Sequence, residues 1–160
     1  MEKIRSFRNL ELWKLGKEVV LDVYRVTGKF PKEEMYGLVS QMRRAAISIP
    51  SNVAEGFNRK HNPEYRQLLY VALGSCAELE TQVEVAHDLS FLSRDDRDGL
   101  LEKLDHESRT YLKIDQALLE RRLRCENMMS RPSISKEICT SSWLRHKSGR
   151  VRNSGNLILR

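Results

Sequence analysis

Apolar side chains recur at intervals of three and four residues over most of this chain, and this period predicts helices. The strongest example is a helix that starts at Asn62, a favourable cap, with Pro63 at its first position. One face of this helix carries a continuous seam: Tyr65, Leu69, Ala72, Cys76, Leu79, Val83 and Ala86. A second stripe lies beside the seam: Leu68, Val71, Ser75, Gln82, Val85 and Leu89. Two stripes predict burial on two sides, inside a bundle or at a contact between subunits.

The first predicted helix covers about residues 10–27. Asn9 is placed to cap this helix and Gly28 to end it. Trp13 and Val20 fall on its apolar face, so we expect both to be buried.

The second predicted helix covers about residues 32–55, with Met35 on its apolar stripe and Gly56 at its end. It contains Pro50, and a proline removes one backbone donor and clashes with the preceding turn. We therefore expect a kink or break near residues 47–51.

The fourth predicted helix begins at Ser93, where Ser93 and Asp96 have the spacing of a capping box, and runs to about Arg124. No segment up to that point sustains the alternation that is typical of strands. The predicted fold is all-α, an antiparallel up-down four-helix bundle over residues 1–124.

Residues 125–160 lose the helical period and include seven serines. They carry seven Lys or Arg and two Asp or Glu, so most of the net charge of +6 lies there. We expect a basic tail that is mostly disordered. A non-functional extension is favoured over an arm that binds an anionic partner.

Composition limits the class of protein. The chain has 160 residues, enough for one core, and 40% are hydrophobic. No run of about 20 apolar residues could cross a membrane, and no secretory signal opens the chain, so we expect a cytoplasmic protein. The three cysteines form no spaced pair, which favours a reducing compartment without disulfides or a zinc site.

Candidate chemistry is sparse. Glu84 and His87 have the spacing of a di-iron carboxylate motif, but the second motif and the further glutamates are missing, so we expect no metal and no cofactor. Cys76 lies on the apolar seam, and the glycines form no phosphate-binding loop. We expect no enzyme activity.

Two groups of cations are candidates for binding phosphates. Arg43 and Arg44 form one group, although the favoured interpretation is interhelical ion pairing, within or between subunits, with the acidic stretch of the third predicted helix: Glu78, Glu80 and Glu84. Arg59, Lys60 and Arg66 lie around the predicted start of a helix, whose N-terminus attracts anions. Four more cations could extend this surface: Arg5, Arg8, Lys14 and Lys17. An ordinary solvated loop is an equally good explanation.

Polar residues near Pro50 are unusual on an element that should be packed. Asn52 and Glu55 need partners there, so we expect a hydrogen-bonded network. A network that locks the kink is favoured over a ligand site.

Four blocks of the chain, taken together, resemble the four-helix-bundle family encoded in intervening sequences of bacterial 23S rRNA genes. These blocks are residues 7–13, 30–38, 41–56 and 74–80. The most distinctive block includes Pro50, Asn52, Glu55 and Gly56, and another includes Ser75, Glu78 and Glu80. Members of this family usually stop near Arg124, so the tail departs from the pattern.

The resemblance implies a left-handed bundle and a ring-shaped homo-oligomer. It implies a homopentamer, as in the related accessory variability determinant of diversity-generating retroelements, which binds nucleic acid and a reverse transcriptase through a positive surface. We therefore expect a non-enzymatic bundle that binds RNA, another nucleic acid or a nucleoprotein, and no membrane. The expected phosphate contacts are Arg43, Arg44, Arg59, Lys60 and Arg66. The alternative is a protein–protein adaptor that binds no nucleic acid.

Overall fold

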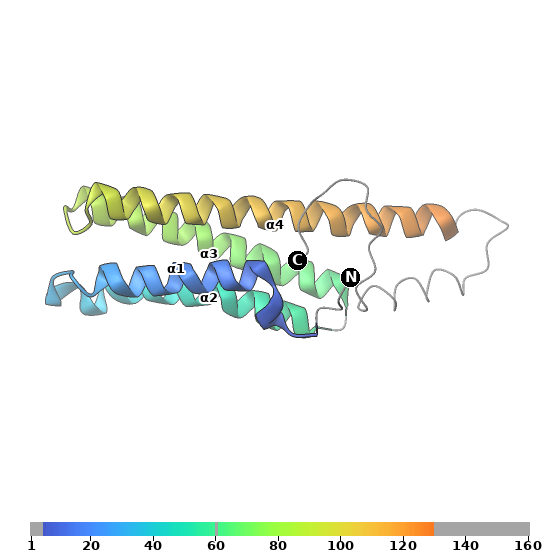
Figure 1. The fold of residues 1–160 in the computed structure, drawn as a ribbon, viewed down its shortest axis with the longest axis horizontal. Helices are drawn as coiled ribbons and strands as arrows, with labels where there is room; N and C mark the ends of the chain where they lie inside the picture. The colour runs from blue at the N-terminus through green and yellow to red at the C-terminus, as the bar shows by residue number, and fades with distance from the viewer. Residues whose placement is uncertain (1–4, 60, 130–160) are drawn as a thin grey trace.

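The computed structural model describes residues 5–59 and 61–129, which are helical with no strand among them (Figure 1). The all-α class is therefore confirmed. There are four α-helices in this part of the chain, namely α1 (Glu11–Thr27), α2 (Leu38–Asn58), α3 (Asn62–Asp88) and α4 (Arg94–Met129). Two short 3₁₀ helices precede α1 and α2, namely η1 (Phe7–Asn9) and η2 (Lys32–Tyr36).

The helices lie side by side along the long axis of the molecule, and α4 projects beyond the others at its C-terminal end (Figure 1). Contacts across α2 and α3 show their relative direction. Ser75 hydrogen-bonds Ser48, whereas Glu78, one turn further along α3, pairs with Arg44, one turn earlier on α2. Residue numbers thus rise on one helix as they fall on the other, so α2 and α3 are antiparallel.

The predicted seam on α3 is confirmed as part of the core. Leu69, Ala72, Cys76, Leu79, Val83 and Ala86 are all buried. Small buried residues on α2, such as Ala45 and Ala46, face the same core and allow close helix packing. On α1, Leu12 and Val19 are buried, whereas Trp13 and Val20 are only half-buried at the edge of the core.

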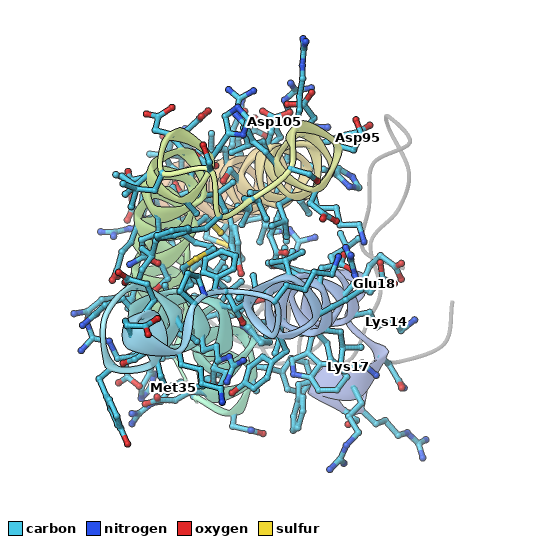
Figure 2. The ribbon with its side chains drawn as sticks, turned by 90° about the vertical axis from the view of Figure 1, so that its left-hand side faces the viewer. Lys14, Lys17, Glu18, Met35, Asp95 and Asp105 are labelled. Atoms are coloured by element: carbon cyan, nitrogen blue, oxygen red, sulfur yellow. The ribbon has the colours of Figure 1, made fainter. Side chains whose placement is uncertain are left out.

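The second predicted helix differs from the structure at both ends. Its first turn is η2, after which Gly37 turns the chain and α2 begins at Leu38. Glu34 accepts a hydrogen bond from the Leu38 backbone N–H at 3.1 Å and so caps α2. Met35 therefore lies in η2 and is exposed, at the outer edge of the molecule in Figure 2.

Of the kink or break expected at Pro50, the break is wrong, because α2 continues through residues 47–51 to Asn58. Pro50 is buried at the contact with Gly16 of α1, and this tertiary packing offsets the cost of proline in a helix. Gly56 does not end α2 either. A Cβ at Gly56 would lie 2.7 Å from the Tyr65 ring, so glycine here permits close packing against α3.

Local signals at the helix ends had mixed success. Asn9 belongs to η1 and does not cap α1, which follows Leu10. At α4, the backbone N–H of Asp96 donates to the Ser93 hydroxyl at 3.2 Å, as a capping box requires. The helix also runs past Arg124, where Arg122 pairs with Glu126 at 2.8 Å. The rest of the predicted tail, residues 130–160, lies outside the described residues.

None of the helices in residues 5–59 and 61–129 is long and apolar enough to span a membrane.

Candidate nucleic-acid interface

The predicted cations of α2 already have intramolecular partners. Arg43 donates from Nε to the Thr27 hydroxyl at 2.9 Å, and its guanidinium lies 4.6 Å from the centre of the Tyr24 ring. Arg44 donates to Gln41 at 2.6 Å and lies 3.9 Å from Glu78. The Arg44 pair is an interhelical ion pair of the kind favoured by the sequence.

The predicted cations at the other end of α2 are also paired. Arg59 forms an ion pair with Glu55. Arg66 makes two hydrogen bonds to Asp115 of α4, at 2.6 and 3.2 Å, and these bonds hold the pKa of Asp115 below its usual range. Lys60 lies outside the described residues. Arg43 and Arg59 are separated by about 24 Å along the helix axis, so the predicted cations do not form one continuous patch.

Instead, cations and aromatic rings gather on one side of α1 and α2. We define the α1/α2 outer face by residues of both helices: Trp13, Lys17, Val20, Tyr24, Arg43, Ile47, Pro50, Ser51 and Ala54. On this face Lys17 Nζ lies 5.6 Å from the centre of the Trp13 ring, and Arg43 lies over Tyr24. Just before α1, Arg8 lies 5.0 Å from the Phe7 ring, which meets Trp13 edge-on at 5.4 Å.

A surface groove of about 280 Å³ runs along the α1/α2 outer face. Its lining residues are Trp13, Lys17, Val20, Ile47, Pro50, Ser51 and Ala54. Within this described lining there is one cation and no carboxylate. In Figure 2, Lys17 lies in the lower part of the view beside Lys14, whereas Asp95 and Asp105 of α4 lie at the top.

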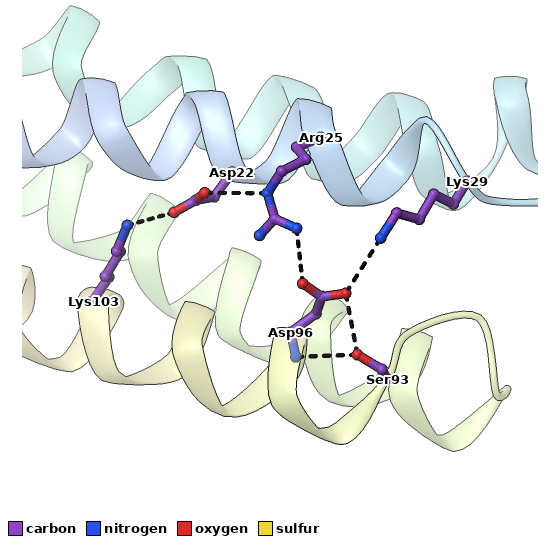
Figure 3. A network of polar contacts seen from close by, with 6 residues as sticks. All are labelled: Asp22, Arg25, Lys29, Ser93, Asp96 and Lys103. Atoms are coloured by element: carbon purple, nitrogen blue, oxygen red, sulfur yellow. Dashed lines mark hydrogen bonds and ion pairs between the residues drawn. The ribbon is translucent and has the colours of Figure 1, made fainter.

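Cations between α1 and α4 form ion pairs in a separate network (Figure 3). Asp96 accepts a hydrogen bond from Arg25 at 2.9 Å and lies 3.7 Å from Lys29. Asp22 pairs with Lys103 at 2.5 Å and with Arg25 at 3.5 Å. The hydrogen bond from Arg25 lowers the pKa of Asp96 below its usual range. This network has three cations and two carboxylates, whereas the described lining of the groove contains no carboxylate.

The polar residues of the distinctive blocks divide into two groups. Asn52 donates to both the backbone oxygen and the hydroxyl of Ser48, at 2.7 and 3.0 Å, and the Ser75 hydroxyl donates to the same Ser48 hydroxyl at 2.9 Å. This network joins α2 to α3 within one turn of Pro50, since Ser48 and Asn52 are each two residues from it. The glutamates of the blocks lie elsewhere: Glu55 and Glu78 form surface ion pairs, and partial burial raises the pKa of Glu80.

One polar core residue was not singled out from the sequence. Glu107 of α4 is fully buried, and burial raises its pKa to about 8. Its Oε1 accepts a hydrogen bond from Tyr111 at 3.2 Å, whereas its Oε2 has no partner among the described residues. The sequence pattern that could have identified Glu107 as buried is its place on the apolar stripe of α4, between Leu104 and Tyr111. A buried, protonated acid at this place shapes the core rather than a surface site.

The motif considered for a metal forms other contacts. Glu84 makes two hydrogen bonds to Arg97, at 2.7 and 2.8 Å, and His87 Nδ1 lies 3.1 Å from the backbone oxygen of Leu92. In the part of the chain that the structure describes, no three His, Cys, Asp or Glu side chains come together as metal ligands would.

The chain matches the family model of the 23S rRNA-intervening sequence protein over residues 8–113. The chain belongs to this family. A solved structure with a similar fold is a protein of unknown function from the S23 ribosomal protein family of Bacteroides thetaiotaomicron. It is 15% identical, with a TM-score of 0.60 over 65% of this chain and 97% of that chain. No curated protein matches.

The residues matched to the family include the α1/α2 outer face. Residues 8–113 contain the entire groove lining and Arg43, as well as the Ser48–Ser75 network. The last turns of α4, which project beyond the bundle, fall after the matched region (Figure 1). The groove is therefore part of the family's domain in this chain.

Proposed function

We propose that this member of the 23S rRNA-intervening sequence protein family is a non-enzymatic helical bundle that binds RNA. The observation that supports the proposal is the α1/α2 outer face, where Lys17 and Arg43 lie over aromatic rings beside a groove whose described lining contains no carboxylate. Cations attract the phosphate backbone, and aromatic rings stack with bases.

The cations named from the sequence contribute unequally in this proposal. Arg43 is part of the outer face. Arg44 and Arg59 form exposed ion pairs, which are weak, so phosphates can compete with Glu78 and Glu55 for them. Arg66 is held by two hydrogen bonds in a less exposed position, so its main contribution is to join α3 to α4.

A binding titration tests this proposal. The probe is the RNA stem of an rRNA intervening sequence, and the affinity is measured by filter binding over a series of salt concentrations. We expect the affinity to fall steeply with salt, because binding releases counterions from the phosphates. Lys17→Gln should weaken binding and reduce the salt slope by about one. The matched control is Arg109→Gln, which removes an α4 cation paired with Asp105. Binding that is absent or insensitive to salt would contradict the proposal.

We also propose that the protein forms a homo-oligomeric ring, with five copies as the resemblance implies. The supporting observation is the second stripe of α3, where Val71, Val85 and Leu89 are 47%, 42% and 52% exposed. A Cβ at Gly74, on the same helix, would meet no atom within 4 Å, so another helix has room to approach there. Light scattering of the purified protein measures the number of copies, and a monomer at micromolar concentration would contradict this proposal.

The same stripe also favours the second candidate function, a protein–protein adaptor, because exposed apolar side chains mark interaction surfaces. Purification from the source cells with and without nuclease separates the two functions. Partners that are lost on nuclease treatment support RNA binding. Partners that remain, together with unchanged binding after Lys17→Gln, support the adaptor.

A further inference from the structure

We infer that the groove of the α1/α2 outer face holds an unpaired base of single-stranded RNA, stacked on Trp13, while Lys17 and Arg43 contact phosphates on either side. This inference rests on the proposed function and names the part of the RNA that the groove recognises.

The aromatic wall of the groove is held in place by its neighbours. Trp13 is half-buried, and the Phe7 ring meets it edge-on, at 5.4 Å and an interplanar angle of 67°. Val20 and Pro50 add apolar atoms to the lining, and the buried Pro50 comes from the opposite helix. A fixed indole beside an apolar groove suits the flat, apolar face of a base.

The polar groups around the groove suit an RNA backbone. Lys17 lies at the Trp13 end, and Arg43 lies over Tyr24 at the other end, about 16 Å further along α1. Arg8, over Phe7, continues the line of cations beyond Trp13. Ser51 donates its hydroxyl proton to the Ile47 backbone oxygen, so its oxygen is able to accept a hydrogen bond from a base.

A second copy of the chain fits this groove less well. In a two-fold contact that pairs the outer face with itself, Lys17 and Arg43 of one copy would lie near the same cations of the other, and like charges disfavour such a contact. A ring would instead bring a different surface of the next copy to the groove, and light scattering of Ala54→Leu tests that arrangement. The second stripe of α3, which contains Val71 and Val85 and no cation, is the better surface for self-association.

The test uses the full chain carrying Trp143→Phe, which leaves Trp13 as the one tryptophan. Two probes of equal length are titrated: a single-stranded oligouridylate and its abasic ribose-phosphate counterpart. We expect the oligouridylate to quench the Trp13 fluorescence and to bind at least about tenfold more tightly than the abasic probe. Equal affinity of the two probes, with no quenching, would overturn the inference even if both bind in a salt-sensitive way.

Ala54→Leu, in the same background, fills the groove without changing a charge. We expect it to lower oligouridylate affinity about tenfold and to leave the affinity for the abasic probe unchanged. The control is Ala117→Leu, at an exposed alanine of α4, which should alter neither. Circular dichroism checks that both variants fold, and the comparison of the two probes does not depend on either variant.

The remaining outcomes are also decisive. If Ala54→Leu changes the mass measured by light scattering, a second copy occupies the groove and the inference is wrong. If neither the oligouridylate nor the intervening-sequence stem binds, the proposed function fails together with the inference. If the stem binds with a steep salt dependence and the oligouridylate does not quench Trp13, the inference alone fails.

Discussion

Glu107 illustrates how a single residue can make the stability of the bundle depend on pH. Its carboxyl group is fully buried among the helices, and a Cβ on Gly16 of α1 would lie 2.9 Å from Oε1. Burial favours the neutral form and raises the pKa from 4.5 to about 8. At neutral pH the folded chain therefore keeps a proton on Glu107 that the unfolded chain releases.

This difference gives a prediction with a definite sign. Because the folded state binds the extra proton, raising the pH from about 4.5 to about 8 favours unfolding. We expect the free energy of unfolding to fall by up to about 1.4 kcal/mol per pH unit from this group within that window. Glu107→Gln stays neutral, so its stability should change less with pH.

Urea denaturation at several pH values measures the effect. The control is Glu102→Gln, at an exposed glutamate of the same helix, which should keep the wild-type pH dependence. If Glu107→Gln and the wild-type protein show parallel curves between pH 5 and pH 8, Glu107 is ionised in the folded bundle and the prediction is wrong.

At the scale of helices, the link between α2 and α3 depends on hydroxyl and amide groups as well as on apolar packing. Ser75 and Asn52 both donate to the Ser48 hydroxyl, so the two bonds share one acceptor. Helices joined in this way have a fixed register, because sliding one past the other would break the bonds.

We therefore predict coupling between these two residues. Ser75→Ala and Asn52→Ala should each lower the free energy of unfolding by about 1 kcal/mol. The loss of unfolding free energy in the double variant should differ from the sum of the two single losses by at least about 0.5 kcal/mol, because the two side chains share one network. Thr81→Ala, at an exposed α3 hydroxyl that bonds its own helix, is the control and should change stability by less than about 0.5 kcal/mol. Strict additivity would exclude a shared network.

The exposed stripe of α3 gives a second prediction at this scale. Val85→Lys places a charge on the exposed stripe of α3, so the stability of the single chain should change by less than about 0.5 kcal/mol. If copies associate through this stripe, the mass of Val85→Lys measured by light scattering should be lower than that of the wild-type protein. Leu112→Lys, at an exposed leucine of α4, is the control and should keep the wild-type mass. An unchanged mass for Val85→Lys would place self-association elsewhere.

The helices themselves were predictable because their signals are local. The seam of α3, the proline in its first turn and the Ser93 cap of α4 are all set by residues within a few positions of one another. The continuity of α2 was not predictable, because it depends on the packing of Pro50 against Gly16 of α1. Local rules treat proline as a break and do not include such tertiary contacts.

The candidate site was predictable in part for the same reason. Trp13 and Lys17 lie four residues apart, so their contact follows from helical spacing. The position of Arg43 over Tyr24 depends on which faces of α1 and α2 meet, which the sequence does not specify. The interhelical pair of Arg44 with α3 was the interpretation that the sequence favoured, whereas the partner of Arg66 on α4 became visible only in the fold.

For the whole molecule, the two proposed surfaces lie on different helices and can act together. The outer face belongs to α1 and α2, whereas the exposed stripe belongs to α3, so a ring in which the stripe meets a surface of the neighbour other than the outer face leaves the groove open. An assembly then presents several identical grooves, and a long RNA can occupy more than one of them.

This arrangement predicts an affinity that depends on RNA length. The assembled wild-type protein should bind a long single-stranded RNA at least about tenfold more tightly than a short one, because the second contact is intramolecular. Val85→Lys should bind the short RNA with wild-type affinity, since its groove is intact, and should lose the gain with length. Lys17→Gln should instead weaken binding to both. Fluorescence anisotropy with labelled RNAs of two lengths measures each affinity. If Val85→Lys becomes monomeric and still binds long RNA more tightly, the gain comes from extra contacts within one chain and not from assembly.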